Sequence, residues 1–317
     1  MNWFEALTGL ESDLPEVVRA GIHVEGTVLN CRKNGRRMAA GRLLTPALAE
    51  LPPPPIGPER IRVREVVADA RALHADPMNA GAAFQVASQF NLLEMINQHI
   101  APDQGIARYA FDRTQGPACA MACAAGTIWR NYFVPLDGGV GQTANRQLDM
   151  LADLGRALGN AEGVHWAMRN GYAMPRPGGL GRVGAQIARA DRTWLKGLVR
   201  VGVQEATEVT LPEAGHLVHQ IYASALPVAY GNDRVADWEP FARLVLEAAY
   251  LATFGSALAI GARRLYLTRL GGGVFGNPQG WITDAMAGAI RAYRAAELDV
   301  QIVSHGSSHP ANRVLLT

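Results

Sequence analysis

The C-terminal part of the chain contains a strand, a glycine loop and a helix in direct succession. Residues 264–270 read as a strand, residues 271–276 are Gly-Gly-Gly-Val-Phe-Gly, and a helical pattern runs from Trp281 to Tyr293. Glycines let a backbone approach an anion closely, and the N–H groups at the start of a helix point toward it. The succession therefore predicts a binding site for a phosphate-bearing ligand.

The same loop matches the dinucleotide-binding pattern G-x-G-x-x-G through Gly271, Gly273 and Gly276. That fingerprint belongs in the first strand-helix unit of a Rossmann fold, yet only residues 277–317 follow it here. The acids at suitable spacing, Glu297 and Asp299, precede the next strand, whereas the ribose-binding acid ends it. A Rossmann cofactor site and a plain structural turn stay open as alternatives.

Size and charge limit the class of protein. The 317 residues, of 34.0 kDa, suffice for one large α/β domain with additions, or for two domains. A net charge of +2 does not indicate a broad basic face for nucleic acid. No run reaches the ~18 apolar residues of a membrane helix, and residues 1–5 lack the basic start of a secretion signal. We therefore expect a cytoplasmic protein without a membrane or nucleic-acid partner.

The cysteines do not form a paired framework. Cys119 and Cys123 lie one helical turn apart in an alanine-rich segment, where small buried packing residues are expected in preference to metal or redox chemistry. His216 and His219 lie three apart without a matching acid, which does not favour zinc. The sequence predicts no metal site.

Strand, loop and helix patterns alternate along the chain. Residues 1–60 are expected to be an N-terminal addition that ends in the stiff proline run 52–55, and residues 61–317 to be one α/β catalytic domain. Alternation of this kind predicts a mixed or mostly parallel sheet flanked by helices. The expected strands include 22–29 and 82–91, and the expected helices include 118–132 and 241–258.

A second glycine-rich loop, residues 135–143, contains Gly138 and Gly139 and is expected to open a helix over residues 144–158. On such a helix Asp149 and Asp153, four residues apart, would share one face. Two acids on a helix often form a solvated face. Because these two follow a glycine loop, a role in a site is an equally good hypothesis.

Taken together, three segments resemble the macrodomain superfamily: a strand ending in Asn91, the Gly138-Gly139 loop followed by residues 147–149, and the loop 271–276. The second is similar to the signature of poly(ADP-ribose) glycohydrolases, in which a glycine triplet is followed by Gln-Glu-Glu. The third resembles the diphosphate-binding loop. Within this branch the chain resembles the macrodomain-like arginine-specific ADP-ribosylhydrolases, over about residues 80 to 310.

The chain departs from that pattern in three ways. Gly138-Gly139 is a pair instead of a triplet, and Leu148-Asp149 stands where the glycohydrolases have two glutamates. Residues 92–137 form an insert between Asn91 and the Gly138-Gly139 pair, which macrodomains usually place close together. This insert must wrap the site or replace part of it. Its role is not carried over from the family.

The resemblance implies hydrolysis of the N-glycosidic bond between ADP-ribose and a protein side chain, with arginine as the expected linkage and with no cofactor. Asp149 would act at the anomeric carbon, and Asp153 would hold the guanidinium leaving group. Asn91 would bind the distal ribose beside Phe275. The other expected ligand-binding residues are Gly138, Gly139, Gln142, Gln147, Gly272, Gly273, Val274, Gly276 and Asn277.

Two other functions remain open at this point. Many macrodomains bind ADP-ribose without turnover, so the chain can be a reader of this group. The G-x-G-x-x-G match allows a nicotinamide-dependent oxidoreductase. The expected partners of the hydrolase are an ADP-ribosylated protein and free ADP-ribose.

Overall fold

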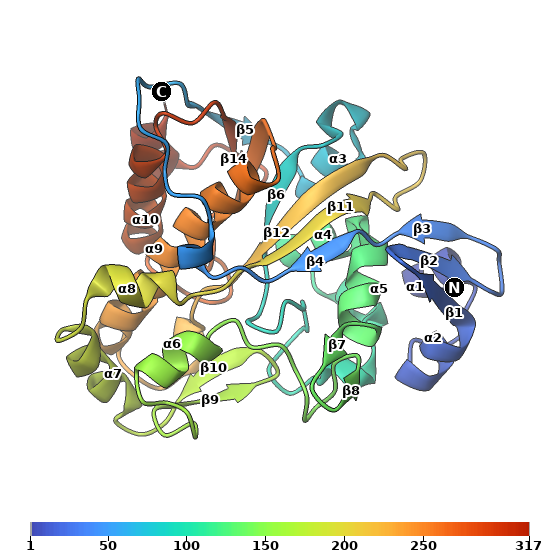
Figure 1. Cartoon of the computed structure of the whole chain (residues 1–317), viewed down its shortest axis with the longest axis horizontal. Helices are drawn as coiled ribbons and strands as arrows, with labels where there is room; N and C mark the ends of the chain where they lie inside the picture. Colours follow the sequence, from blue (N-terminus) through green and yellow to red (C-terminus); the bar gives the residue numbers. More distant parts are fainter. Residues whose placement is uncertain (1, 317) are drawn as a thin grey trace.

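A seven-stranded sheet forms the centre of the computed structural model, which describes residues 2–316 (Figure 1). The strand order is β4-β11-β12-β6-β13-β14-β5. In that order the strands are Arg42–Leu44, Gly202–Glu208, Leu217–Ala223, Ala83–Ala87, Arg264–Leu267, Asp299–Ser304 and Arg62–Val67. The five neighbouring strands from β12 to β5 run parallel. At one edge of the sheet, β11 pairs antiparallel with β12, and β4 pairs antiparallel with β11. The predicted mixed sheet flanked by helices is confirmed.

Helices cover both faces of the sheet, and strand β6 shows this most directly. Phe84 stacks on His74 of α3 (Ala70–Ala75), with ring centroids 3.8 Å apart. The next residue, Gln85, donates a hydrogen bond of 2.9 Å to Thr253 of α9 (Val235–Ala259) on the other face. Since successive side chains of a strand point to opposite faces, α3 and α9 lie on opposite sides of the sheet. Helix α4 (Gln115–Ala122) packs beside α3, and α10 (Gln279–Ala292) beside α9.

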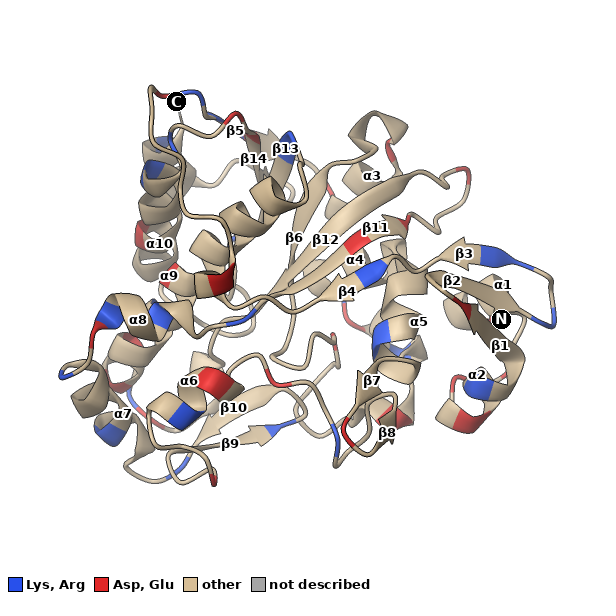
Figure 2. Cartoon of the chain, in the orientation of Figure 1, with Lys and Arg blue, Asp and Glu red and all other residues tan. Residues whose placement is uncertain are grey.

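Helix α9 is long and apolar enough to cross a membrane by length and composition. In the structure, 78% of the most apolar 18-residue stretch of this helix is buried, against β12, α10 and neighbouring elements. Its apolar character is therefore accounted for by packing in the core. Charged residues of both signs are spread over the outer elements and gather on no single face in the view of Figure 2.

The N-terminal segment builds a second hydrophobic cluster. Helices α1 (Trp3–Thr8) and α2 (Pro15–Gly21) and a three-stranded sheet pack against α5 (Ala124–Tyr132) and residues 93–109. That small sheet consists of β1 (Ile22–Glu25), β2 (Val28–Cys31) and β3 (Arg37–Ala39). The boundary at residue 60 stays a prediction, but β4, from within the segment 1–60, pairs with β11 of the main sheet.

The remaining elements lie at the periphery of the sheet (Figure 1). They are β7 (Pro135–Leu136), β8 (Gly139–Val140), α6 (Ala152–Ala157), β9 (Trp166–Arg169), β10 (Tyr172–Pro175), α7 (Gly179–Ile187) and α8 (Arg192–Gly197). Short 3₁₀ helices occupy Leu48–Glu50, Pro77–Asn79, Pro102–Gln104, Ala107–Phe111, Val228–Tyr230 and Pro310–Leu315.

Three predicted elements differ in the structure. The strand 22–29 is the hairpin β1-β2, because Gly26 adopts φ +60° in the turn. The helix 118–132 begins at Gln115 and breaks at Cys123, whose φ and ψ of −115° and 58° are not helical. The helix predicted over 144–158 is wrong: only Ala152–Ala157 is helical, because residues 143–146 form a turn closed by a bridge.

Candidate functional site

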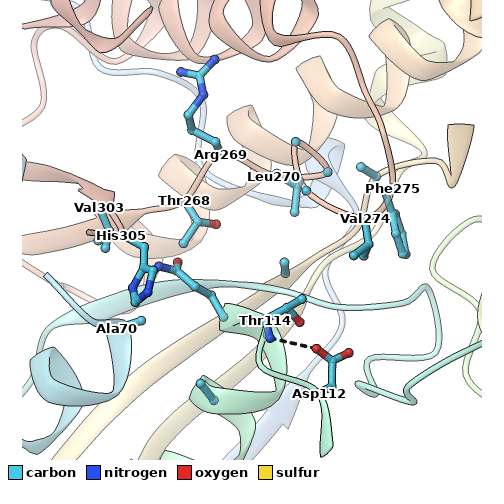
Figure 3. Close-up of a pocket in the computed structure, with 18 of the residues that line it drawn as sticks. Ala70, Asp112, Thr114, Thr268, Arg269, Leu270, Val274, Phe275, Val303 and His305 are labelled. Carbon is cyan, nitrogen blue, oxygen red and sulfur yellow. Dashed lines mark hydrogen bonds between the residues drawn. The ribbon is translucent and has the colours of Figure 1, made fainter. Parts of the chain in front are cut away.

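The carboxyl ends of the parallel strands open into a cavity of about 640 Å³. Ligands of α/β proteins commonly bind at this edge, beyond the ends of the strands. The walls follow β5, β6, β13 and β14 and include the start of α4 (Figure 3). The lining residues are 69–70, 87–89, 94–96, 112–116, 118, 172, 225, 230, 268–275, 279, 303–305 and 307–310.

The glycine loop after β13 forms one wall. The backbone N–H groups of Gly273, Val274 and Phe275 donate no hydrogen bond to any atom of residues 2–316. Three successive free amides make a concave anion-binding surface. Gly273 leaves this surface accessible, since no heavy atom lies within 4 Å of where its Cβ would be. The loop therefore has the form predicted for a phosphate site.

Two other residues of the loop fix its course. Gly271 adopts φ +73°, and a Cβ there would lie 2.5 Å from the Cβ of Ala225. Asn277 is buried and donates to the carbonyl oxygens of Leu226 and Gly271, at 2.8 and 3.3 Å. Gly276 and Asn277 do not line the cavity, so they hold the loop that Gly272, Gly273, Val274 and Phe275 present.

Arg269 supplies positive charge beside this loop. Its guanidinium donates to Gln279, Thr283 and Asn312, and all of these acceptors are neutral. The side chain lies against α10 and points away from Val274 and Phe275 (Figure 3). Because no carboxylate of the described chain neutralises it, its charge adds to the favourable potential for an anion at the free amides.

Glu94 is a buried acid in the wall of the cavity. Only 4% of the residue is exposed, and its Oε1 has no hydrogen-bond partner in residues 2–316. Burial raises the pKa of Glu94 well above the ordinary value, nearby Arg130 opposes this shift, and the charge of Asp112 adds to it. A carboxyl whose pKa is raised in this way is suited to donate a proton within the cavity.

The segment that carries Glu94 is held from several sides. Leu92 adopts φ +63°, a strained value for a residue with a side chain. Gln89 fastens the segment by bonding both the N–H and the carbonyl of Met95, at 2.8 and 3.1 Å. The hydroxyl of Tyr109 accepts a bond of 2.9 Å from the N–H of Glu94. The acid therefore has a fixed backbone position.

The first turn of α4 places more donors in the cavity. Asp112 accepts a hydrogen bond of 2.8 Å from the N–H of Thr114 (Figure 3). The next two N–H groups, of Gln115 and Gly116, have no acceptor in the described chain. A Cβ on Gly116 would run into the carboxylate of Glu94 and lie 2.6 Å from the carbonyl oxygen of Ala87. Only glycine fits there beside Glu94.

Aromatic rings close one end of the cavity. Tyr172, Tyr230 and Phe275 contact one another with ring centroids 5.3, 5.4 and 5.7 Å apart. Their rings form an apolar wall beside the free amides. Such a wall suits the apolar face of a ring, such as the carbon face of a sugar.

Glu65 organises the part of the rim that follows β14. Its carboxylate accepts bonds from Ser304 (2.6 Å), Ser308 (2.5 Å), the N–H of His309 (2.8 Å) and Asn312 (2.7 Å). Burial alone would raise the pKa of Glu65, but these bonds outweigh it and lower the pKa from 4.5 to about 2. The ionised carboxylate thus holds residues 304–312 in place.

Acidification is expected to loosen this rim. Since the pKa of Glu65 is lower in the folded chain than in the unfolded one, its stabilisation is complete above pH 4.5 and is lost as the pH falls toward 2. Ligand affinity and melting temperature, measured from about pH 6 to about pH 3, should fall in that window. Glu65→Gln should flatten this dependence. An unchanged slope in the variant would assign the acid transition to another group.

The predicted ribose-binding residue and its neighbours brace the segment of Glu94 instead of lining the cavity. Asn91 is fully buried, donates 2.9 Å to Gln147 and accepts 3.1 Å from the N–H of Leu93. Gln142 donates 3.0 Å to the carbonyl of Asn91. Gly138 and Gly139 lie in the exposed β7-β8 hairpin, packed on Arg146. None of these residues lines the cavity.

Asp149 and Asp153, the predicted catalytic acids, also lie outside the lining of the cavity. Asp149 precedes α6 and accepts 2.8 Å from the N–H of Leu151. Asp153 contacts Arg156 and pairs with Arg200 at 2.6 Å, while Arg200 pairs with Glu50 at 3.2 Å. The premise that the two acids share one helix face is wrong, since Asp149 lies before the helix.

Asp153→Asn is expected to lower stability and leave ligand binding unchanged. The substitution removes the charge that bonds Arg200, whose side chain is only 29% exposed. Loss of a hydrogen bond between charged groups typically costs about 1.5–3 kcal/mol. Urea unfolding should show this loss, while ADP-ribose affinity should match that of the original protein. A folded variant with lost affinity would place Asp153 in the site after all.

Sequence reasoning missed the acid Glu94, although it expected the insert 92–137 to wrap the site or replace part of it. One signal was available, since Glu94 follows a buried strand by a few residues. Cys119 and Cys123 are buried packing residues, and burial raises the pKa of both thiols. Residues 2–316 contain no group of three His, Cys, Asp or Glu side chains that could hold a metal ion.

No protein-family model matches this chain, and no curated protein matches it. A solved poly(ADP-ribose) glycohydrolase from Thermomonospora curvata is similar, with TM-score 0.46 and 15% identity over 94% of this chain and 93% of that one. A structure of poly(ADP-ribose) glycohydrolase from the same organism, bound to the inhibitor ADP-HPD, has TM-score 0.44 and 16% identity over 93% of this chain and 91% of that one. Poly(ADP-ribose) glycohydrolase from Deinococcus radiodurans in complex with ADP-ribose has TM-score 0.43 and 12% identity over 82% of this chain and 83% of that one.

Proposed function

We propose that this protein is an ADP-ribosyl hydrolase, which binds an ADP-ribosyl group in the cavity and cleaves its bond to a protein side chain. One observation carries the proposal: three free amides, Gly273 to Phe275, and the buried acid Glu94 line the same cavity. The amides suit an anionic diphosphate. The acid suits proton donation to a leaving group.

The diphosphate would lie on the glycine loop. Free amides stabilise oxyanions, and α10 begins directly after the loop with its N-terminus toward it. The unneutralised charge of Arg269 adds to this attraction. The distal ribose would then lie against Phe275 and Tyr172, which brings its anomeric carbon toward Glu94.

The proposed reaction uses two carboxyl groups in different environments. Glu94 donates its proton to the leaving nitrogen as the bond from that nitrogen to the anomeric carbon breaks. Asp112, half-buried in the same wall, accepts a proton from the attacking water, whose oxygen bonds to the anomeric carbon. Proton return from Asp112 to Glu94 through solvent completes the cycle. Opposite protonation states of two nearby acids are the usual division in glycoside hydrolysis.

Arginine is the linkage that we propose within this class. The guanidine that leaves takes up a proton as its bond to the anomeric carbon breaks, and the guanidinium that results matches a carboxylate. Glu94 and Asp112 offer a proton donor and a carboxylate at the wall of the cavity. The assignment of these roles to Glu94 and Asp112 replaces the earlier expectation for Asp149 and Asp153, because the latter pair does not reach the cavity lining.

The two other functions have different support. A reader of ADP-ribose would use the same glycine loop but has no need of a buried acid. An oxidoreductase would need an acid for the cofactor ribose at the end of the next strand. Asp299 lies instead at the start of β14, paired with Arg264 at 3.2 Å. This position favours the hydrolase over the oxidoreductase.

Calorimetry with ADP-ribose and with NAD, followed by an assay for release of ADP-ribose from arginine-modified, serine-modified and poly-modified proteins, tests the proposal. We expect binding of ADP-ribose, weaker binding of NAD, and release from the arginine-modified protein. Binding without release from any substrate would support the reader. Absence of ADP-ribose binding would overturn the proposal altogether.

A further inference from the structure

Arg130 of α5 is a buried cation whose hydrogen bonds go only to neutral groups. The residue is fully buried, and its Nε donates 3.1 Å to the carbonyl of Leu92. Its other bonds go to the neutral side chains of Gln204 (3.0 Å) and Thr127 (3.1 Å), and its guanidinium carbon lies 3.7 Å from the ring centre of Tyr222. Buried charges normally have a charged partner, so this arrangement calls for an explanation.

The bond to Leu92 connects Arg130 with the acid of the cavity. Leu92 holds the strained φ of +63°, and Glu94 lies two residues further on. Glu94 has the complementary defect, because its Oε1 is buried and has no partner in residues 2–316. The groups that act electrostatically on Glu94 or are influenced by it are Arg130, Asp112, Tyr109, Tyr172, Tyr222 and Cys119. Arg130 is the single cation among them.

We propose that Arg130 is the positioning residue of Glu94: it fixes the Leu92–Glu94 segment through the Leu92 carbonyl and supplies the positive charge that stabilises the carboxylate left after proton donation. This inference rests on the proposed hydrolase function. Arginine stays protonated in proteins, so its charge is constant while that of Glu94 changes during turnover. Arg130 does not line the cavity. It acts through Glu94.

The physical consequence concerns the strength of the acid. An opposite charge nearby favours the ionised form of a carboxyl, commonly by about 1–3 pKa units. Removing the charge of Arg130 makes Glu94 a weaker acid. A weaker acid keeps its proton to higher pH, so the alkaline limb of the pH-rate profile moves upward while the maximal rate falls. A purely structural role for Arg130 lowers the rate at every pH and moves no limb.

The test compares Arg130→Gln, which removes the charge and keeps a donor, with Arg130→Lys, which keeps the charge. The pKa of Glu94 is measured by isotope-edited infrared spectroscopy of its carboxyl, with Glu94→Gln to assign the band, and the pH-rate profile is measured in parallel. We expect Arg130→Gln to raise the pKa of Glu94 by at least about 1 unit and Arg130→Lys to restore most of the original value. An unchanged pKa in folded Arg130→Gln would overturn the inference.

The infrared measurement needs no turnover, so it separates this inference from the hydrolase proposal. A shifted pKa in a protein that releases no ADP-ribose supports the pairing of Arg130 with Glu94 and rejects the hydrolase. Should Arg130→Gln fail to fold, Gln204→Glu places a carboxylate at the acceptor that the guanidinium already bonds. Because that carboxylate offsets the charge of Arg130, we expect an upward shift of the pKa of Glu94, and its absence would overturn the inference.

Discussion

Glu94→Gln is expected to reduce release of ADP-ribose by a hundredfold or more while ADP-ribose still binds. Glutamine keeps the size of the side chain and its place beside Gly116, but it cannot donate a proton that it then recovers as an acid. Positioned acids and bases typically contribute about 10²–10⁴ in rate. Single-turnover release from an arginine-modified protein measures the loss, and calorimetry measures the affinity. Removing the partly unpartnered buried acid should not lower the melting temperature.

Asp149→Asn is the matched control for this substitution. Burial raises the pKa of Asp149 as it does that of Glu94, and the bond from the N–H of Leu151 opposes that shift. Asp149 does not line the cavity, however. The control variant should therefore turn over at close to the original rate. The reverse result, full activity in Glu94→Gln and none in Asp149→Asn, would return the catalytic role to Asp149.

Gly273→Val is expected to weaken ADP-ribose binding at least tenfold, which corresponds to about 1.4 kcal/mol. No heavy atom lies within 4 Å of the position of the new Cβ, so the fold tolerates the side chain. The branched side chain would occupy the space in front of the free amides of Gly273, Val274 and Phe275. Calorimetry with ADP-ribose measures the effect, and thermal unfolding confirms that the variant is folded.

Gly280→Val is the matched control, because it makes the same substitution at a glycine outside the cavity lining. Gly280 is also exposed, also has no heavy atom within 4 Å of its absent Cβ, and does not line the cavity. Its substitution should leave affinity unchanged. Equal losses in both variants would mean that the effect comes from the helix start and not from blocked amides. Unchanged affinity in Gly273→Val would move the diphosphate away from this loop.

The sheet and the glycine loop could be predicted because their signals are local. A strand followed by glycines and a helix is visible in consecutive residues, and it corresponds to β13, residues 271–276 and α10. The acid could not be identified in the same way. Glu94 becomes a candidate only when the chain folds back and buries it against Gly116, with Arg130 contributing from another helix. These contacts join residues that no periodicity connects.

The helix predicted to carry Asp149 was wrong for a related physical reason. The spacing of apolar residues over 148–158 fits a helix, but the turn at Thr143–Arg146 and the bond from the N–H of Leu151 to Asp149 delay its start to Ala152. Asn91, Gln142 and Gln147 form one hydrogen-bonded group. Their contacts support the segment that carries Glu94. The described contacts assign them to bracing that segment and not to the cavity lining.

The position of β13 between β6 and β14 has a consequence for how the chain folds. The wall with Glu94 follows β6 early in the sequence, whereas the wall with the free amides follows β13, and the two strands pair at Leu265↔Ala83 and Tyr266↔Phe84. During synthesis the N-terminal part emerges first. Strand β6 therefore has no β13 to pair with until residues 264–267 have been synthesised. Pairings that span so much sequence form slowly. The cavity is consequently among the last parts of the molecule to be completed, and a chain interrupted before β13 lacks the wall with the free amides entirely.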